Sequence, residues 1–130
     1  MCLKTFILVF LLFNVCVARL SEFRFNGTFI CDSPPATPIC ITLTYWEEDE
    51  WTVNDVIGRT PVSCSMDPIR RIETTGFQDG DGPFDRRYEV YLDIFHNCNK
   101  RGLYRKMYSY ISDPTTDSDL IAISFNVTLE

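Results

Sequence analysis

Residues 88–98 read Y-E-V-Y-L-D-I-F-H-N-C and alternate strictly between two kinds of side chain. The first set, at every second position, is Tyr88, Val90, Leu92, Ile94, His96 and Cys98. The second set is Glu89, Tyr91, Asp93, Phe95 and Asn97. A period of two residues is typical of a β-strand, because successive side chains of a strand point to opposite faces of the sheet. We therefore predict a strand whose first set faces a core.

The rest of the chain repeats this kind of pattern and shows no helical periodicity. Further strands are predicted at residues 23–31, 39–45, 55–62, 69–74, 103–111 and 120–129. Prolines and the run G-F-Q-D-G-D-G-P at 76–83 separate them, and the acidic run W-E-E-D-E-W at 46–51 is expected to be a hairpin connection. Short strands at this spacing predict an all-β sandwich of about seven antiparallel strands.

The first 18 residues have the pattern of a secretory signal peptide. A short segment with one positive charge, Lys4, precedes an apolar run, and Cys16-Val17-Ala18 places small residues before a predicted cleavage site. The apolar run is shorter than the 20 or so residues of a membrane span. We expect residues 1–18 to be removed and 19–130 to form one secreted, extracellular domain without a membrane span.

The charge of this domain limits its partners. Without the signal peptide the chain has 11 basic and 18 acidic side chains, a net charge of −7. Binding to nucleic acid or to an anionic membrane depends on positive potential, so neither is expected. Two sequons, at Asn26 and Asn126, predict a glycoprotein, and both asparagines fall on the strand face opposite the apolar residues.

Four cysteines remain after the signal peptide: Cys31, Cys40, Cys64 and Cys98. An even number in a secreted chain indicates two disulfide bonds, with three possible pairings. Cys98 lies two residues from the only histidine, His96. A catalytic dyad would need a free thiol, and a zinc site would need at least one more ligand. A disulfide cysteine beside a hydrogen-bonded, neutral histidine is the better interpretation, with no catalytic, metal or cofactor site.

Several short motifs together resemble the nematode transthyretin-like family of secreted proteins. They are G-T-F-I-C at 27–31, P-A at 35–36, the acidic run 47–50, N-D at 54–55, G-R-T at 58–60, Y-L-D-I-F-H-N-C-N at 91–99 and the final L-E. The resemblance implies a transthyretin-like (prealbumin-like) Greek-key sandwich, with the first and fifth strands in different sheets. In that fold, the expected pairs are Cys31–Cys98, across the core, and Cys40–Cys64, within one sheet.

The same resemblance implies a function in extracellular recognition. We expect a non-enzymatic binding or signalling protein that acts at cell surfaces on an extracellular protein, a lipid headgroup or a small apolar ligand. A carrier of hydrophobic small ligands is the alternative. A hydrolase related to hydroxyisourate hydrolases is disfavoured, because that chemistry relies on several histidines and a Tyr-Arg-Gly-Ser tail, whereas this chain ends N-V-T-L-E.

Two further groups of residues were candidates for binding. Asp79-Gly80-Asp81-Gly82 is similar to part of a calcium loop, and the acidic run at 47–50 with Asp55 offers oxygen ligands, but an EF-hand needs a closing Glu and flanking helices. We interpret these acids as exposed turn charges. The predicted binding surface is aromatic, because such residues are enriched at interfaces; it consists of Trp46, Trp51, Tyr104, Tyr108 and Tyr110.

Overall fold

The computed structural model describes residues 2–5, 13–16, 20–49, 53–79 and 86–130. Within them the secondary structure is all β. The strands are β1 (Cys2–Thr5), β2 (Phe13–Cys16), β3 (Leu20–Cys31), β4 (Ile39–Glu47), β5 (Asp55–Arg59), β6 (Ser63–Ser65), β7 (Ile69–Asp79), β8 (Val90–His96), β9 (Arg105–Ser112) and β10 (Leu120–Leu129). β1 and β2 pair with each other, and the remaining strands form two sheets. The seven predicted strands correspond to β3, β4, β5, β7, β8, β9 and β10.

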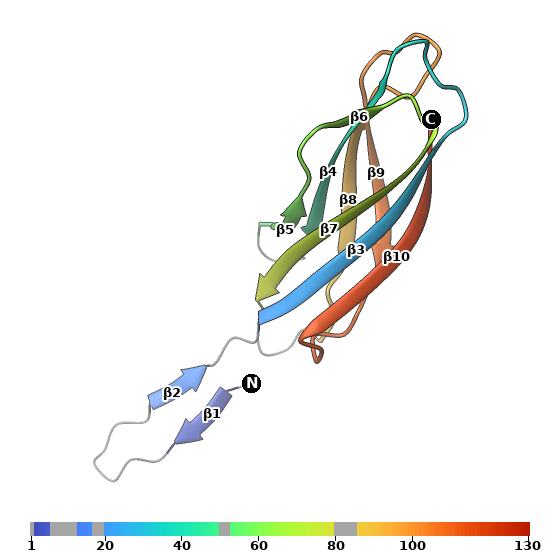
Figure 1. Cartoon of the computed structure of the whole chain (residues 1–130). Coiled ribbons are helices and arrows are strands. Elements are labelled where there is room, and N and C mark those ends of the chain that lie inside the picture. The colour runs from blue at the N-terminus through green and yellow to red at the C-terminus, as the bar shows by residue number, and fades with distance from the viewer. Residues whose placement is uncertain (1, 6–12, 17–19, 50–52, 80–85) are drawn as a thin grey trace.

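The two sheets lie face to face (Figure 1). The sheet called here the three-stranded sheet has the order β10-β3-β7. The larger sheet has the order β5-β4-β8-β9, and the short β6 pairs with β4 beside β5. The first predicted strand, β3, and the fifth, β8, are therefore in different sheets.

One pair of strands corrects the prediction of a wholly antiparallel fold. β10 runs parallel to β3, in a register from Leu120 opposite Glu22 to Leu129 opposite Cys31. β9 and β10 follow each other in the chain but lie in different sheets, so the connection 113–119 crosses from one sheet to the other. β10 consequently pairs with a strand distant in sequence. The alternation of side chains within one strand does not specify which other strand it pairs with.

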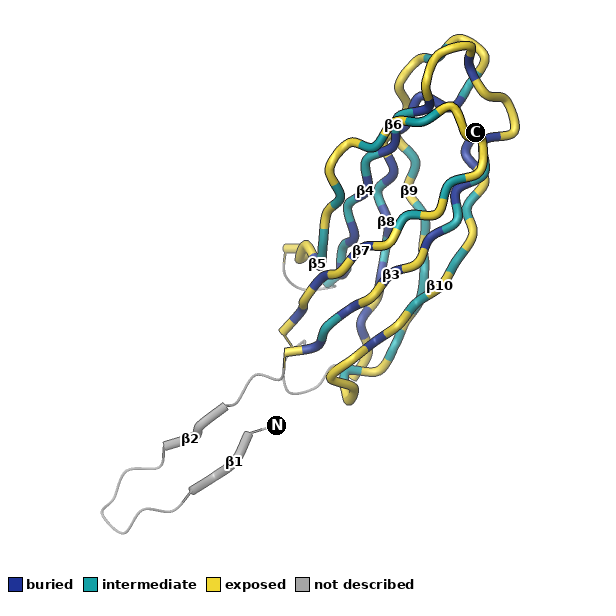
Figure 2. The backbone as a smooth tube through the Cα atoms, viewed as in Figure 1, coloured by how far each residue is buried: buried dark blue, intermediate teal, exposed yellow. Residues whose placement is uncertain are grey.

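The core lies between the sheets, where buried residues of the strands face one another (Figure 2), and it combines aliphatic side chains with several aromatic rings. Phe25 of β3 stacks on Tyr45 of β4 with ring centroids 3.8 Å apart, and Phe23 meets Tyr88 edge to face at 5.2 Å. The predicted inner face of the fifth strand is confirmed, since every member from Tyr88 to Cys98 is buried. In β10 only Ile121 and Leu129 are fully buried, because this strand is at the edge of its sheet.

β7 is longer than predicted and helps to close one edge of the sandwich. The expected strand 69–74 continues to Asp79, so Gly76 lies inside a strand and not in a turn. A Cβ atom on Gly76 would lie 2.3 Å from the Ile57 carbonyl oxygen of β5, and one on Gly58 would lie 3.2 Å from the Thr75 oxygen. These two glycines let strands of the two sheets approach backbone to backbone.

Two disulfides cross-link the sandwich. Cys31 at the end of β3 is bonded to Cys98 just after β8, and this bridge joins the two sheets. Cys40 of β4 is bonded to Cys64 of the adjacent β6, within one sheet. These are the pairs that the family resemblance implied. Residues 63–68 had been expected to form only a loop, but β6 gives Cys64 a strand position directly opposite Cys40.

Candidate binding face

The larger sheet carries a row of aromatic side chains on its outer face. In β4 and β8, alternation turns one set of residues into the core and leaves the other set outside. The register places Trp46 beside Tyr91 and Tyr91 beside Tyr110. We call this surface the aromatic face; it consists of Trp46, Tyr91, Phe95, Tyr104, Tyr108 and Tyr110. Four of these residues, Phe95, Tyr104, Tyr108 and Tyr110, are 48–55% exposed.

The rings of the aromatic face hold one another in place. Tyr91 and Tyr108 stack with centroids 4.9 Å apart and planes 10° apart, and Tyr110 meets Tyr91 edge to face at 5.3 Å. Phe95 stacks on Tyr104 at 5.0 Å. Stacked and edge-to-face pairs contribute about 0.5–1.5 kcal/mol beyond burial of area. The rings are thus ordered before any partner arrives, which lowers the entropic cost of binding.

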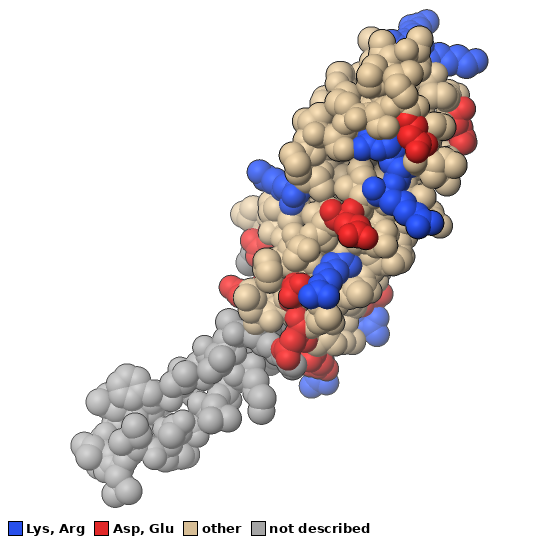
Figure 3. All heavy atoms as spheres, viewed as in Figure 1, with Lys and Arg blue, Asp and Glu red and all other residues tan. Residues whose placement is uncertain are grey.

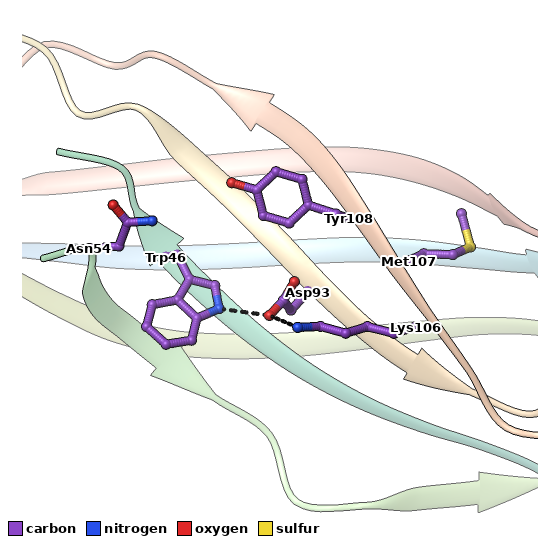
Figure 4. A pocket seen from close by; sticks show the side chains of 6 residues that line it. All are labelled: Trp46, Asn54, Asp93, Lys106, Met107 and Tyr108. Atoms are coloured by element: carbon purple, nitrogen blue, oxygen red, sulfur yellow. Dashed lines mark hydrogen bonds and ion pairs between the residues drawn. The ribbon is translucent and has the colours of Figure 1, made fainter. Parts of the chain in front are cut away.

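A polar group lies in the middle of this face (Figure 4). The Trp46 indole N–H donates to Asp93 Oδ2 at 3.2 Å, and the Lys106 ammonium pairs with the same oxygen at 2.9 Å. Together with Asn54, Met107 and Tyr108, these residues line an open depression of about 470 Å³. Asp93 therefore fixes the indole while the ring remains at the surface.

Carboxylates surround the tyrosines and make this end of the face electronegative. A hydrogen bond to the Glu48 side chain, followed by partial burial and the charge of Glu48, raises the pKa of Tyr91 to about 12. Burial and the charges of Glu48 and Asp93 raise the pKa of Tyr108. The pKa of Tyr110 is also raised, by burial and then by nearby acidic groups. All three phenols stay neutral hydrogen-bond donors at physiological pH.

The structure brings most of the predicted aromatic residues together. Trp46, Tyr104, Tyr108 and Tyr110 all lie on the aromatic face, whereas Trp51 is outside the described residues. Tyr104 precedes β9, which begins at Arg105, and had been expected within the strand. The prediction missed Tyr91 and Phe95. The alternation in residues 88–98 already placed both opposite the core face, so this signal was present in the sequence.

The outer face of the three-stranded sheet is different in kind. Its outward residues are mainly small, polar or charged, and acidic and basic groups are interspersed over β7 and β3 (Figure 3), whereas β10 has no charged side chain. Asn26 and Asn126, the sequon asparagines, are both exposed here. Asn26 is paired with Ser124 and Asn126 with Thr28, so the two asparagines are two positions apart on neighbouring strands. We call this surface the sequon face.

The acidic run after the second strand is not a set of exposed turn charges, as had been expected. Glu47 is 0% exposed at the end of β4, where it continues the inward alternation, and its carboxylate lies within 4.8 Å of those of Asp49 and Asp55. The Gln78 amide donates to Glu47 at 3.3 Å and to Asp55 at 3.1 Å. Gln78 of β7 thus links two of these three acids by hydrogen bonds. Residues 50 and 80–82, the rest of the calcium candidates, lie outside the described residues.

The His96–Cys98 pair belongs to the interior. His96 is 0% exposed, and its Nδ1 accepts a 3.1 Å hydrogen bond from the Cys98 backbone N–H. Burial, followed by the charge of Arg105, lowers the pKa of His96. Cys98 is in a disulfide, so it offers no thiolate. The neutral, hydrogen-bonded histidine beside a disulfide is the arrangement that the sequence had suggested.

Comparison with known proteins places the chain in a family. Residues 26–129 match the model of a family described as Caenorhabditis elegans protein of unknown function (DUF870). The chain belongs to this family. The DUF870 match extends from within β3 to the end of β10, so it includes both outer faces.

One relative and one solved structure add to this. An uncharacterized C. elegans protein, B0416.7, is 32% identical over 89 residues, which cover 66% of this chain and 64% of the relative. The chain thus spans a little under two thirds of the relative's length. A 9R-lipoxygenase from Cyanothece is similar over 85% of this chain and 16% of its own, at 14% identity and a TM-score of 0.41. That likeness is too low to carry an argument about the DUF870 protein.

Proposed function

We propose that this protein is a secreted, non-enzymatic binding protein that recognises a cell-surface protein through the aromatic face. The observation that carries the proposal is the ordered, half-exposed row of rings on one outer face of a cross-linked sandwich. Four of them are 48–55% exposed, and Tyr91 stacks on Tyr108 and meets Tyr110 edge to face. Tyrosine and tryptophan are enriched among the residues that dominate interface energies. Rigid rings on a rigid sheet meet a partner at low entropic cost.

Three features support secretion and a transthyretin-like sandwich. The first 18 residues have the signal-peptide pattern, and two disulfides suit an oxidising compartment. β3 and β8 lie in different sheets, as the transthyretin-like Greek key implies. Among the described residues, no helix is long and apolar enough to cross a membrane.

The packing of the interior favours surface recognition over the two alternatives, a carrier of small apolar ligands and a hydrolase. The space between the sheets is occupied by rings such as Phe25 and Tyr45, only 3.8 Å apart, so a small apolar ligand would have to displace core side chains. A hydrolase would need an accessible base, whereas His96 is 0% exposed and its Nδ1 is already an acceptor. The outer face remains as the place for recognition of a protein, a lipid headgroup or an apolar ligand.

The test compares variants of the two outer faces. The full chain is expressed with its own leader in a eukaryotic secretory line, and N-terminal sequencing of the secreted product should begin at Arg19. The labelled protein is then bound to nematode cells. The double variant Tyr91→Ser/Tyr108→Ser should bind at least 30-fold more weakly, about 2 kcal/mol. The control Arg24→Ser/Thr75→Ser, on the sequon face, should bind as the wild type does.

Thermal unfolding of both variants checks that each is folded. Equal binding by the aromatic-face variant and the wild type would overturn the proposal. So would a loss of binding confined to the sequon-face control.

A further inference from the structure

We propose that the aromatic face binds arginine side chains of an extended, basic segment of a partner protein. This inference deepens the proposed function and rests on it. It places the binding position at the end of the face where Tyr91, Tyr108 and Tyr110 meet the carboxylates of Glu48 and Glu89. The argument rests on ring geometry, on which carboxylates already have a cation, and on the charge of the whole chain.

The rings suit a planar cation. The ring planes of Tyr91 and Tyr108 are nearly parallel in their stack, 10° apart, and Tyr108 and Tyr110 are 55% and 53% exposed. A guanidinium group stacks flat on an aromatic ring and keeps its N–H groups free at the edge to donate hydrogen bonds. A quaternary ammonium would instead be held best by rings that enclose it, and the depression beside Tyr108 is open.

Two carboxylates at this end lack a cation. The backbone N–H of Glu48 donates to the Glu89 carbonyl oxygen at 2.9 Å, which holds the two residues together where β4 ends and β8 is about to begin. Both carboxylates lie close enough to Tyr91 to raise its pKa. Neither takes part in an ion pair among the described residues. A guanidinium on the tyrosines would find acceptors at the rim of the rings.

Two basic residues near the tyrosines are already paired. Lys106 binds Asp93 at 2.9 Å, and Arg87 binds Asp113 at 2.8 Å. These pairs offset the charges of Asp93 and Asp113. The negative charge that is left near the tyrosines comes from Glu48 and Glu89. The whole chain has a formal charge of −6, which would steer a basic partner toward it. Charge complementarity therefore selects a cationic occupant.

Spacing selects an extended segment. Most rings of the aromatic face lie on or next to β8 and β9, and same-face residues of a strand repeat about every 6.6 Å. Arginines at alternate positions of an extended peptide have the same repeat. One arginine would stack on Tyr110 and the next on Tyr108, which lies two positions away on the same face of β9. On the opposite side of the molecule the predicted glycans at Asn26 and Asn126 would leave the aromatic face uncovered.

The test uses defined peptides and the secreted full chain. The probe is the peptide acetyl-Ser-Arg-Ser-Arg-Ser-Arg-Ser-amide, and its matched controls carry lysine or citrulline in place of arginine. Binding is measured by calorimetry. We expect the arginine peptide to bind at least fivefold more tightly than the lysine peptide, and the citrulline peptide not to bind. Affinity should fall as salt is raised.

Variants locate the site. Glu48→Gln/Glu89→Gln should weaken the arginine peptide at least fivefold. The control Glu22→Gln/Glu73→Gln on the sequon face, which makes the same change of charge, should leave affinity almost unchanged. Equal binding of the arginine and citrulline peptides would overturn the inference. So would an absence of peptide binding together with binding to phosphatidylcholine vesicles or to oligosaccharides.

The same variants separate this inference from the proposed function. If cell binding is lost in Tyr91→Ser/Tyr108→Ser but kept in Glu48→Gln/Glu89→Gln, the aromatic face still binds a partner and the arginine inference fails. If cell binding survives in the tyrosine variant, the proposed function fails, and the inference that depends on it fails too.

Discussion

The two outer faces of the sandwich are built by the same rule and carry opposite chemistry. In both sheets every second residue of a strand points away from the core. On the three-stranded sheet those positions hold Asn26, Arg71, Asn126 and similar polar groups. On the larger sheet they hold Tyr91, Phe95 and the aromatic residues beside them.

This difference shows that the fold does not determine which residue types occupy the outward positions of its strands. The core requires apolar residues facing inward, and both sheets meet that requirement. Stability places little constraint on what stands outside, so a polar sheet surface is the ordinary outcome for a protein that stays in solution. Phe77 on the sequon face is a single half-exposed ring, whereas a cluster of such rings is an exception that needs another reason. We therefore propose recognition at the aromatic face and glycan attachment at the sequon face.

The largest expected effect comes from breaking the covalent link between the faces. The Cys31→Ala/Cys98→Ala variant loses a bridge between the sheets with a sequence separation of 67 residues. The loop-entropy model gives a loss of about 4 kcal/mol in the free energy of unfolding. Urea unfolding followed by tryptophan fluorescence measures it.

The second disulfide provides the matched control. Cys40→Ala/Cys64→Ala opens a loop with a separation of 24 residues within one sheet, so the same model gives a loss smaller by about 1 kcal/mol. Cys31 and Cys98 are also almost fully buried, whereas Cys64 is exposed. A larger loss from the Cys40–Cys64 pair would show that the inter-sheet bridge is not the main covalent constraint.

A smaller effect is expected at the edge where the sheets touch. Gly76→Ala would place its Cβ 2.3 Å from the Ile57 carbonyl oxygen, and a backbone atom cannot move aside without shifting β5. We expect a loss of about 1–3 kcal/mol, the usual cost of overpacking. Gly27→Ala is the control, because its Cβ would meet the ring ends of Phe29 and Phe125, which can rotate. Thermal unfolding should rank Gly76→Ala as the less stable of the two.

The sequon face can be tested by removing its predicted glycans. β10 is an end strand of its sheet, and residues 120–129 contain no charged side chain and no proline, which are the usual protections against edge pairing. A glycan on Asn126 would cover this edge. We expect Asn126→Gln to self-associate more than Asn26→Gln, which lies on the central strand β3, as measured by sedimentation velocity. Identical behaviour of the two variants would assign the protection of the edge to another feature.

Sequence reasoning succeeded where a single strand carries the information. The alternation in 88–98 defined the inner face of β8 correctly, and the spacing of Tyr104, Tyr108 and Tyr110 placed them together on one side. The same alternation could have identified Tyr91 and Phe95. Their stacking on Tyr108 and Tyr104, however, depends on the register between β8 and β9, which no single strand specifies.

Sequence reasoning failed where the position of a residue depends on contacts with residues distant in the chain. Glu47 was assigned to a hairpin connection with the rest of the acidic run, yet it is buried, and Gln78, 31 residues away on β7, supplies a hydrogen bond to it. Gly76 was assigned to a turn because it begins a glycine-rich run. In the structure it is a glycine inside a strand, where it leaves room for the close approach of Ile57 in the other sheet. The parallel pairing of β10 with β3 likewise follows from a crossing between sheets. Local patterns contain none of these contacts.

The smallest expected effect concerns His96, in the interior that the two faces share. Burial lowers its pKa below the unfolded value of about 6.5, so below that pH the unfolded chain binds more protons than the folded one. The contribution of His96 to stability is therefore full above about pH 6.5 and is lost as the pH falls through and below that value. Protonation at Nδ1 would also remove the acceptor of the Cys98 N–H. The free energy of unfolding of His96→Leu should consequently fall less than that of the wild type between about pH 7.5 and about pH 5.5. Since other groups titrate equally in both proteins, the difference between the two slopes isolates His96, and equal slopes would mean that it does not titrate differently on folding.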